Sequence, residues 1–409
     1  MYRVRTGRIP MRALTVTLGF ILVAALGVGA VTVSAGAQGE PPERLTEKQL
    51  LSRVTAAPEN APDFSVTVTA EQTLVPEGLL GASEGDTGDS GQRTARVWRG
   101  GPDQLRTELQ GENGDRVLVR DGDRVSVYNG TSNTLKTGEK PEDAPDGAST
   151  PDGLPGASAE EIDEVLAEIT PSSKLTAGAP VEVAGRWAYP LTLEPKDKSV
   201  TLVERAEALV DVEAFVPLSF ELYAEGRSEP VARYEARDFE VGPVPDARFE
   251  FETPPGATVE QMEPGNHNRP DEYRGGGEPR KAASVEEASE LAGFSVEALP
   301  AAPGGRELEE IRAAKNGAVL TYGSGWGTVV LAEKAVGDGQ GAGPLSGVEG
   351  TGDEAQVPAV DLGGGVQARE LSTPVGSVLS WSEGGVSYTL AGSVPPAELR
   401  EAARGLLAR

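Results

Sequence analysis

The sequence contains no cysteine and a single histidine, His267. Without cysteine the chain has no disulfide, no thiolate metal site and no thiol to carry a lipid. A chain of this length does not depend on disulfides, because it can bury adequate hydrophobic cores. His267 stands in a stretch with almost no apolar residues, so neither a Ser-His-Asp triad nor a multi-histidine metal site is expected. We predict no catalytic residue, no metal site and no cofactor.

Acidic residues also outnumber basic ones, 64 to 37, which gives a formal net charge of −27. Such a surface repels nucleic acid and anionic membranes, so we expect no nucleic-acid partner and no polybasic membrane contact. Carboxylates are plentiful, but Glu160, Glu161, Asp163 and Glu164 share the polar face of a predicted helix, where a solvated surface is the simpler interpretation. Enzymatic activity is therefore the least favoured of the functions we consider.

The N-terminus has the pattern of an export signal. Four arginines precede residue 13, an apolar run follows to Val33, and Ala35-Gly36-Ala37 has the small-residue pattern of a cleavage site. The apolar run is also long enough to span a bilayer. Residues 1–37 are thus a cleaved signal peptide or a retained membrane anchor, and both alternatives place the rest of the chain outside the cytoplasm.

Apolar and polar residues alternate over much of residues 64–252, which is typical of half-buried strands. Asp121-Gly122 predicts a tight hairpin turn. Helices are predicted after a capping box at Thr46 and Gln49, and over 158–169 after a second capping box. Many strands and few helices favour an α+β fold with an antiparallel sheet. Strands are expected near 64–71, 93–98, 104–109, 116–120, 124–129, 181–194, 206–214, 218–224, 231–239 and 248–252.

Residues 263–282 are rich in proline, glycine and charge, and we interpret them as a linker between a domain at 40–262 and a smaller one at 283–409. The smaller domain opens with a helix capped by Ser284 and Glu287 and closes with a helix from Pro396. Strands near 317–322, 327–333, 377–382 and 386–391 lie between them, which predicts a second α+β unit.

Four short motifs in the first domain have a familiar order: VSVY at 125–128, GRWAYPL at 185–191, VPL at 216–218 and FEFETPPG at 249–256. From about Leu45 to Gln261 the chain resembles the LolA-like superfamily of lipoprotein carriers, which includes the N-terminal domain of the MucB/RseB sigma-factor regulators. The tail, with VLSW at 378–381 and YTLAG at 388–392, resembles a domain of unknown function common after such carriers in Gram-positive envelope proteins.

The resemblance implies a curved antiparallel half-barrel with a helical lid over an apolar concave face. The helix at 158–169 would be the lid, through Ile162, Val165, Leu166 and Ile169, and Arg106 resembles a strand arginine that holds the lid in carriers. An ordinary sealed core remains the alternative to an open cleft. The residues expected to line the cleft are Phe64, Val66, Val68, Leu105, Val117, Val125, Val127, Leu191, Leu193, Phe220, Leu222, Phe249 and Phe251.

Two functions follow from the resemblance. The first is a non-enzymatic, extracytoplasmic carrier whose partner is a lipid or lipoprotein acyl chain. The second is an envelope-stress sensor of the MucB/RseB type, which would act through a membrane regulatory protein. The second domain favours the sensor, because a simple carrier does not need it.

Overall fold

The computed structural model describes residues 40–74, 92–111, 114–139, 165–183, 185–262, 279–336 and 357–408. Chain contacts divide these residues into two compact units. The larger unit contains the described residues up to Glu194 and those from Arg205 to 262, and the smaller unit contains Pro195–Glu204 together with 279–408. Each unit is a mainly antiparallel sheet with few helices, so the predicted α+β class is confirmed.

The larger unit is organised around a 13-stranded sheet, counted over the described residues. Its order is β13-β6-β5-β4-β3-β2-β1-β12-β11-β10-β9-β7, with β8 paired to β9. The strands are β1 (Phe64–Gln72), β2 (Gln92–Arg99), β3 (Gln104–Leu109), β4 (Arg116–Asp121), β5 (Arg124–Asn129), β6 (Thr134–Glu139), β7 (Ser173–Ala177), β8 (Val181–Val183), β9 (Arg186–Pro195), β10 (Val203–Asp211), β11 (Pro217–Ala224), β12 (Ala232–Val241) and β13 (Thr258–Gln261).

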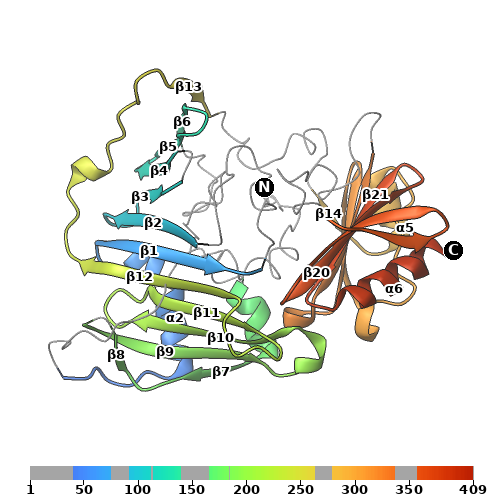
Figure 1. Ribbon diagram of the computed structural model, residues 1–409, viewed down its shortest axis with the longest axis horizontal. Coiled ribbons are helices and arrows are strands. Elements are labelled where there is room, and N and C mark those ends of the chain that lie inside the picture. Colours follow the sequence, from blue (N-terminus) through green and yellow to red (C-terminus); the bar gives the residue numbers. More distant parts are fainter. Residues whose placement is uncertain are drawn as a thin grey trace, which may run out of the picture. The chain divides into compact units, whose positions relative to one another are not determined.

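This sheet is open and curved, because its order starts at β13 and ends at β7 and its strands follow an arc (Figure 1). β1 lies in the middle of the sheet, between β2 and β12. Its register with β12 shifts between Ser65 and Thr67, and Asp238 in the irregular stretch of β12 has a φ of 53°. Such a bulge bends a strand and increases its twist. The open half-barrel expected from the resemblance is therefore confirmed.

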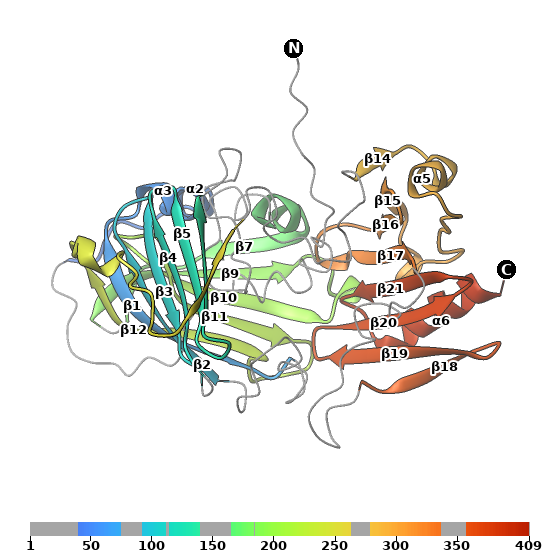
Figure 2. The same ribbon diagram turned by 90° about the horizontal axis from the view of Figure 1, so that it is seen from above.

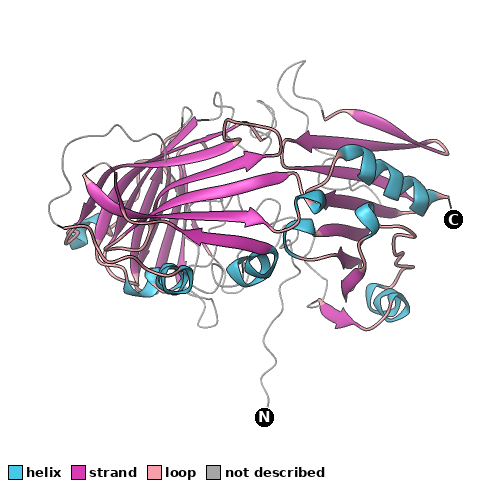
Figure 3. Cartoon of the chain, turned by 90° about the horizontal axis from the view of Figure 1, so that it is seen from below, coloured by secondary structure: helices cyan, strands magenta, loops and turns pink. Residues whose placement is uncertain are grey.

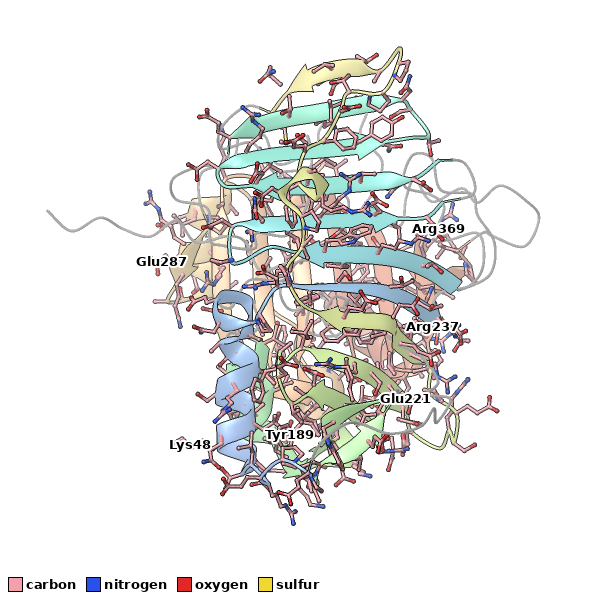
Figure 4. All side chains as sticks on the ribbon, turned by 90° about the vertical axis from the view of Figure 1, so that its left-hand side faces the viewer. Lys48, Tyr189, Glu221, Arg237, Glu287 and Arg369 are labelled. Carbon is pink, nitrogen blue, oxygen red and sulfur yellow. The ribbon has the colours of Figure 1, made fainter. Side chains whose placement is uncertain are left out.

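Helix α2 (Glu47–Thr55) begins at the predicted capping box, in which Thr46 and Gln49 bond to each other's backbone. Leu50 on this helix is completely buried, and the helix contacts β7. The hydroxyl of Tyr189 on β9 donates to the Glu43 carbonyl oxygen, 2.9 Å away, just before α2. Figure 4 labels Lys48 on this helix and Tyr189. Helix α3 (Ala57–Asn60) follows and leads into β1.

The chain between β12 and β13, residues 242–257, is called the closing segment. The strand predicted at 248–252 is wrong, because Asp246–Arg248 form a 3-10 turn and no strand follows until β13. Phe249 instead packs against the sheet, with Val117 and Val119. A Cβ atom on Gly100 would lie 2.6 Å from the Phe249 ring, so glycine is needed for this approach. Figure 1 shows the closing segment on the convex side of the arc.

The smaller unit has an eight-stranded sheet in the described residues, with the order β14-β15-β16-β17-β21-β20-β19-β18 (Figure 2). Helix α5 (Val285–Ala292) begins at Ser284, as predicted, and helix α6 (Pro396–Leu407) packs against β20 and β21 (Figure 3). The strands are β14 (Arg280–Ala282), β15 (Leu308–Ala314), β16 (Gly317–Tyr322), β17 (Val329–Ala335), β18 (Ala359–Gly363), β19 (Val366–Thr373), β20 (Gly376–Glu383) and β21 (Val386–Gly392).

Two boundaries differ from the sequence prediction. Residues 280–282, assigned above to the linker, form β14 and pair with β15. Pro195–Glu204, which connects β9 to β10, belongs to the smaller unit and is called the docked segment. Its Thr201 hydroxyl lies 2.8 Å from the Ser393 hydroxyl, and the Arg306 guanidinium donates to the Val200 carbonyl at 2.7 Å. These contacts join residues that are far apart in the sequence, so no local sequence pattern predicts them.

Candidate binding face of the larger sheet

The register of the strands separates the two faces of the larger sheet, because directly opposed residues in antiparallel strands point to the same side. Val66, Val97, Thr107, Leu118 and Val127 are opposed in succession from β1 to β5. This row lies opposite to the closing segment and defines the concave face. Ten predicted cleft residues lie on it, Leu191 and Leu193 because the contact of Arg205 with Tyr223 aligns the faces of β10 and β11: Phe64, Val66, Val68, Leu105, Val125, Val127, Leu191, Leu193, Phe220 and Leu222.

Three predicted cleft residues lie on the other side of the sheet, which corrects the expectation of a single shared face. Val117 is opposed to Tyr128, and its neighbour Leu118 is opposed to Val127. Phe249 and Phe251 belong to the closing segment and form a separate apolar cluster with Val117. Strand β4 thus has apolar residues on both faces, with Val117 and Val119 on the convex side and Leu118 on the concave side, and simple alternation did not reveal this.

Beyond the closing segment, the convex face is polar. Arg233 pairs with Glu221 at 3.3 Å and Arg237 with Glu235 at 3.0 Å, and Glu221 and Arg237 are labelled in Figure 4. The Tyr223 hydroxyl donates to Glu221 at 2.7 Å, and burial together with this carboxylate raises the pKa of Tyr223 to about 12. This part of the convex face thus carries paired charges, some of them buried like Glu235, rather than an apolar surface for a ligand.

The concave face differs in exposure from one side to the other. On the β9–β12 side, Leu191 and Leu222 are 6% and 1% exposed, as is usual in a sealed hydrophobic core. On the β3–β5 side, Leu105 and Val125 remain partly exposed. We call the apolar cluster on that side the open patch, and it consists of Leu105, Leu109, Leu118, Val125 and Val127.

The predicted lid is described only in part. Residues 165–169 are helical, and Ile169 is 2% exposed, whereas Val165 and Leu166 are partly exposed. The Ser173 hydroxyl donates to the Ile169 carbonyl at 2.7 Å and so ties the end of this helix to β7. Ile162 lies outside the described residues. The role of these residues as a lid therefore stays a prediction.

Arg106 does not contact the described part of that helix. It lies on the convex side of β3, where its guanidinium donates to the carbonyl oxygens of Arg248 and Glu250 at 3.0 and 3.2 Å. It also pairs with Glu108 at 2.7 Å. Arg106 thus fastens the closing segment across the convex face, which corrects its expected place beside the lid.

Arg99, which sequence reasoning missed, holds the segment that follows α3 to the concave face. It is 6% exposed, and its guanidinium donates to the carbonyl oxygens of Ala61 and Pro62, just after α3. Burial lowers the pKa of Arg99, the charge of Asp63 opposes that shift, and the positive charge of Arg120 adds to it. Arg99 is the last residue of a strand with alternating residues, and nothing in the neighbouring sequence predicts this role.

The described residues hold no group of three or more histidine, cysteine, aspartate or glutamate side chains arranged to bind a metal ion. Within the same ranges, no helix is long and apolar enough to cross a membrane. The predicted export segment at 1–37 lies outside them. What the larger unit offers chemically is thus an apolar surface with a few buried cations beside it.

The larger unit has the open, curved antiparallel sheet that the sequence resemblance predicted. No protein-family model and no curated protein matches the chain. Among solved structures, MucB in complex with MucA from Pseudomonas aeruginosa is 14% identical with a TM-score of 0.43, and the match covers 87% of this chain and 96% of that one.

Two further solved structures match about half of the chain. A LolA superfamily protein from Nitrosomonas europaea is 13% identical with a TM-score of 0.22, and the match covers 51% of this chain and 98% of that one. The lipoprotein LppX of Mycobacterium tuberculosis is 12% identical with a TM-score of 0.25, with coverages of 49% and 99%. At such low identities and TM-scores, function must be argued from this chain's own residues.

Proposed function

We propose that the larger unit is a non-enzymatic, extracytoplasmic binding domain that holds a lipid or lipoprotein acyl chain against the open patch. The observation that carries this proposal is the partial exposure of Leu105 and Val125 on the concave face of a sheet that is not closed. An apolar concave surface with a few polar groups beside it is the usual form of a lipid site.

Burial of an acyl chain against such a patch would give a useful affinity. Each acyl methylene removed from water contributes about 0.8 kcal/mol, so ten of them contribute about 8 kcal/mol before the costs of association. After those costs, a dissociation constant of roughly micromolar or weaker is expected. Such a complex forms and releases its ligand readily, as a carrier requires.

The export segment predicted at 1–37 supports an extracytoplasmic location. A cleaved segment would release the protein, and a retained one would tether it to the cell membrane. Both alternatives place the open patch where envelope lipids and lipoproteins are found.

The proposal is tested by native mass spectrometry of the exported region, purified without detergent, followed by titration of the delipidated protein with a fluorescent acyl chain. We expect co-purified lipid and saturable binding that Val125→Asp weakens. Binding that is absent in the parent protein, or that Val125→Asp leaves unchanged, would refute the open patch as the site.

A second candidate is an envelope sensor that passes lipid occupancy to a membrane regulatory protein. The docked segment favours it, since the connection between β9 and β10 is part of the smaller unit. Protease protection of Pro195–Glu204 should then differ between the delipidated and the lipid-loaded protein. Equal protection in both states would leave the carrier as the simpler function.

A further inference from the structure

Two polar atoms within the open patch are buried and have no hydrogen-bond partner in the described part of the protein: Thr107 Oγ1 and Arg120 Nε. Thr107 has no exposed surface at all. A buried donor without a partner costs free energy, and such groups are rare in folded proteins. Their presence calls for a partner that the chain itself does not supply.

The two atoms belong to neighbouring strands and to the same face. Thr107 on β3 is opposed to Leu118 on β4, and Arg120, two residues further on, is opposed to Leu105. Thr107 and Arg120 are therefore diagonal neighbours, roughly 7 Å apart between their Cα atoms. Arg120 is opposed on its other side to Val125. The polar pair thus lies inside the open patch.

Arg120 is held in place by its far end. Its Nη2 donates to the Pro102 carbonyl at 2.6 Å, which anchors the guanidinium and leaves Nε–H without a partner. Nε–H can only donate, and a hydroxyl donates or accepts, so the group that satisfies both is an acceptor oxygen. The permanent charge of Arg120 favours an oxygen with negative charge.

A second cation lies on the same face. Arg99 is opposed to Leu105 from the β2 side, so Leu105 stands between Arg99 and Arg120. Because both arginines are opposed to Leu105, their charges lie on one face of neighbouring strands. Burial lowers the pKa of Arg99, the charge of Asp63 raises it, and the charge of Arg120 lowers it further. In a chain with a net charge of −27, this is a local concentration of positive charge beside an apolar surface. A ligand with both an acyl chain and an anionic end matches that combination.

We propose that Thr107 and Arg120 receive the anionic oxygen of an amphiphile, a carboxylate or a phosphate, whose acyl chain lies along the open patch. This inference rests on the proposed function and specifies the headgroup of its ligand. The partly exposed Leu105 and Leu109 flank Thr107 on β3, so the approach to the buried hydroxyl passes between their side chains.

Three ligands of equal chain length test the inference on the delipidated exported protein: dodecanoate, dodecyl phosphate and dodecanol. Calorimetry below the micellar concentration should show that at least one anionic ligand binds about tenfold more tightly than dodecanol, because hydrogen bonds to charged groups are strong. A preference for the phosphate over the carboxylate would indicate a phospholipid-type ligand, and the reverse would indicate a fatty acid.

Variants assign the preference to the two residues. Arg120→Met should remove the anionic preference and leave dodecanol binding unchanged, and Arg120→Lys should keep part of it through its charge. Thr107→Val should reduce the preference several-fold while the melting temperature stays equal or rises, since it removes a buried hydroxyl without a partner. Matched controls are Arg124→Met at the exposed start of β5 and Thr67→Val on the convex face.

The outcomes separate the two proposals. Equal binding of all three ligands, or a preference that survives both Arg120→Met and Thr107→Val, overturns the headgroup site and leaves acyl binding intact. A lower melting temperature of Thr107→Val with an unchanged preference identifies a trapped water as the hydroxyl's partner and overturns its role. Failure of all three ligands to bind would instead refute the proposed function.

Discussion

At the scale of the residue, burial distinguishes two kinds of apolar side chain on the same concave face. Leu191 is 6% exposed, and Val125 is partly exposed. Leu191→Asp places an unpaired carboxylate in a sealed core, so we expect loss of the fold. Val125→Asp faces Arg120 across the ladder and should leave a folded protein with at least tenfold weaker acyl binding.

Circular dichroism and a fluorescent-lipid titration of the two variants measure this difference. If Val125→Asp also unfolds the larger unit, the open patch is part of the core, and the binding face must be sought elsewhere. A folded Leu191→Asp protein would show that the β9–β12 side of the concave face admits water and is not a sealed core.

Glu333 in the smaller unit is a residue whose charge should make stability depend on pH. Its carboxyl is 2% exposed, accepts from the Glu297 backbone N–H at 3.1 and 3.2 Å, and lies opposite Tyr388. Burial raises the pKa of Glu333 from its ordinary 4.5 to about 8, and the charge of Glu297 adds to the shift. The folded state therefore binds the proton more tightly than the unfolded state does.

A raised carboxyl pKa stabilises the fold fully below pH 4.5, and this contribution is lost as the pH rises to about 8. The loss approaches about 1.4 kcal/mol per pH unit at most. Glu333→Gln stays neutral and should flatten the decline, so its free energy of unfolding at pH 8 should exceed that of the parent. Urea denaturation at pH 5 and pH 8 measures this, with the exposed Glu309→Gln as the control. Parallel pH profiles for Glu333→Gln and the parent would contradict it.

At the scale of the element, sequence predicts what local rules determine. The capping box at Thr46 and Gln49 and the tight hairpin between β4 and β5 depend only on neighbouring residues, and both are present, although the two turn residues are Gly122 and Asp123 rather than Asp121 and Gly122. The closing segment depends on contacts with distant strands. Phe249 and Phe251 alternate like strand residues, yet they pack over β4, because Gly100 and Val117 provide the surface for them.

In the candidate site, too, sequence predicts the features that local rules determine and misses those that depend on distant contacts. Period-two alternation accounts for the ten of the thirteen predicted residues that share one face, because that follows from strand geometry. It does not predict which part of that face is sealed, since this depends on the helices and strands that cover it. Arg99, Thr107 and Arg120 were not predicted either, because their importance comes from register and burial across β2, β3 and β4.

At the scale of the whole molecule, the smaller unit is built from two separate parts of the chain. The docked segment contributes Thr201, which is 5% exposed, and the hydroxyls of Thr201 and Ser393 are 2.8 Å apart. The Leu202 backbone N–H donates to the Ser393 hydroxyl at 3.0 Å, and the Ser393 hydroxyl donates to the Val375 carbonyl at 2.7 Å. Ser393 is thus the point where this segment joins the sheet.

The absence of cysteine makes this junction easy to test. The double variant Thr201→Cys/Ser393→Cys places two thiols where two hydroxyls now meet, close to the geometry that a disulfide requires. After mild oxidation, a protease cut within the linker predicted at 263–282 should give two fragments that stay joined on a non-reducing gel and separate on reduction. The control Thr201→Cys/Ser372→Cys, with an exposed second site, should separate under both conditions. Fragments of the first variant that separate without reductant would show that the docked segment does not belong to the smaller unit in solution.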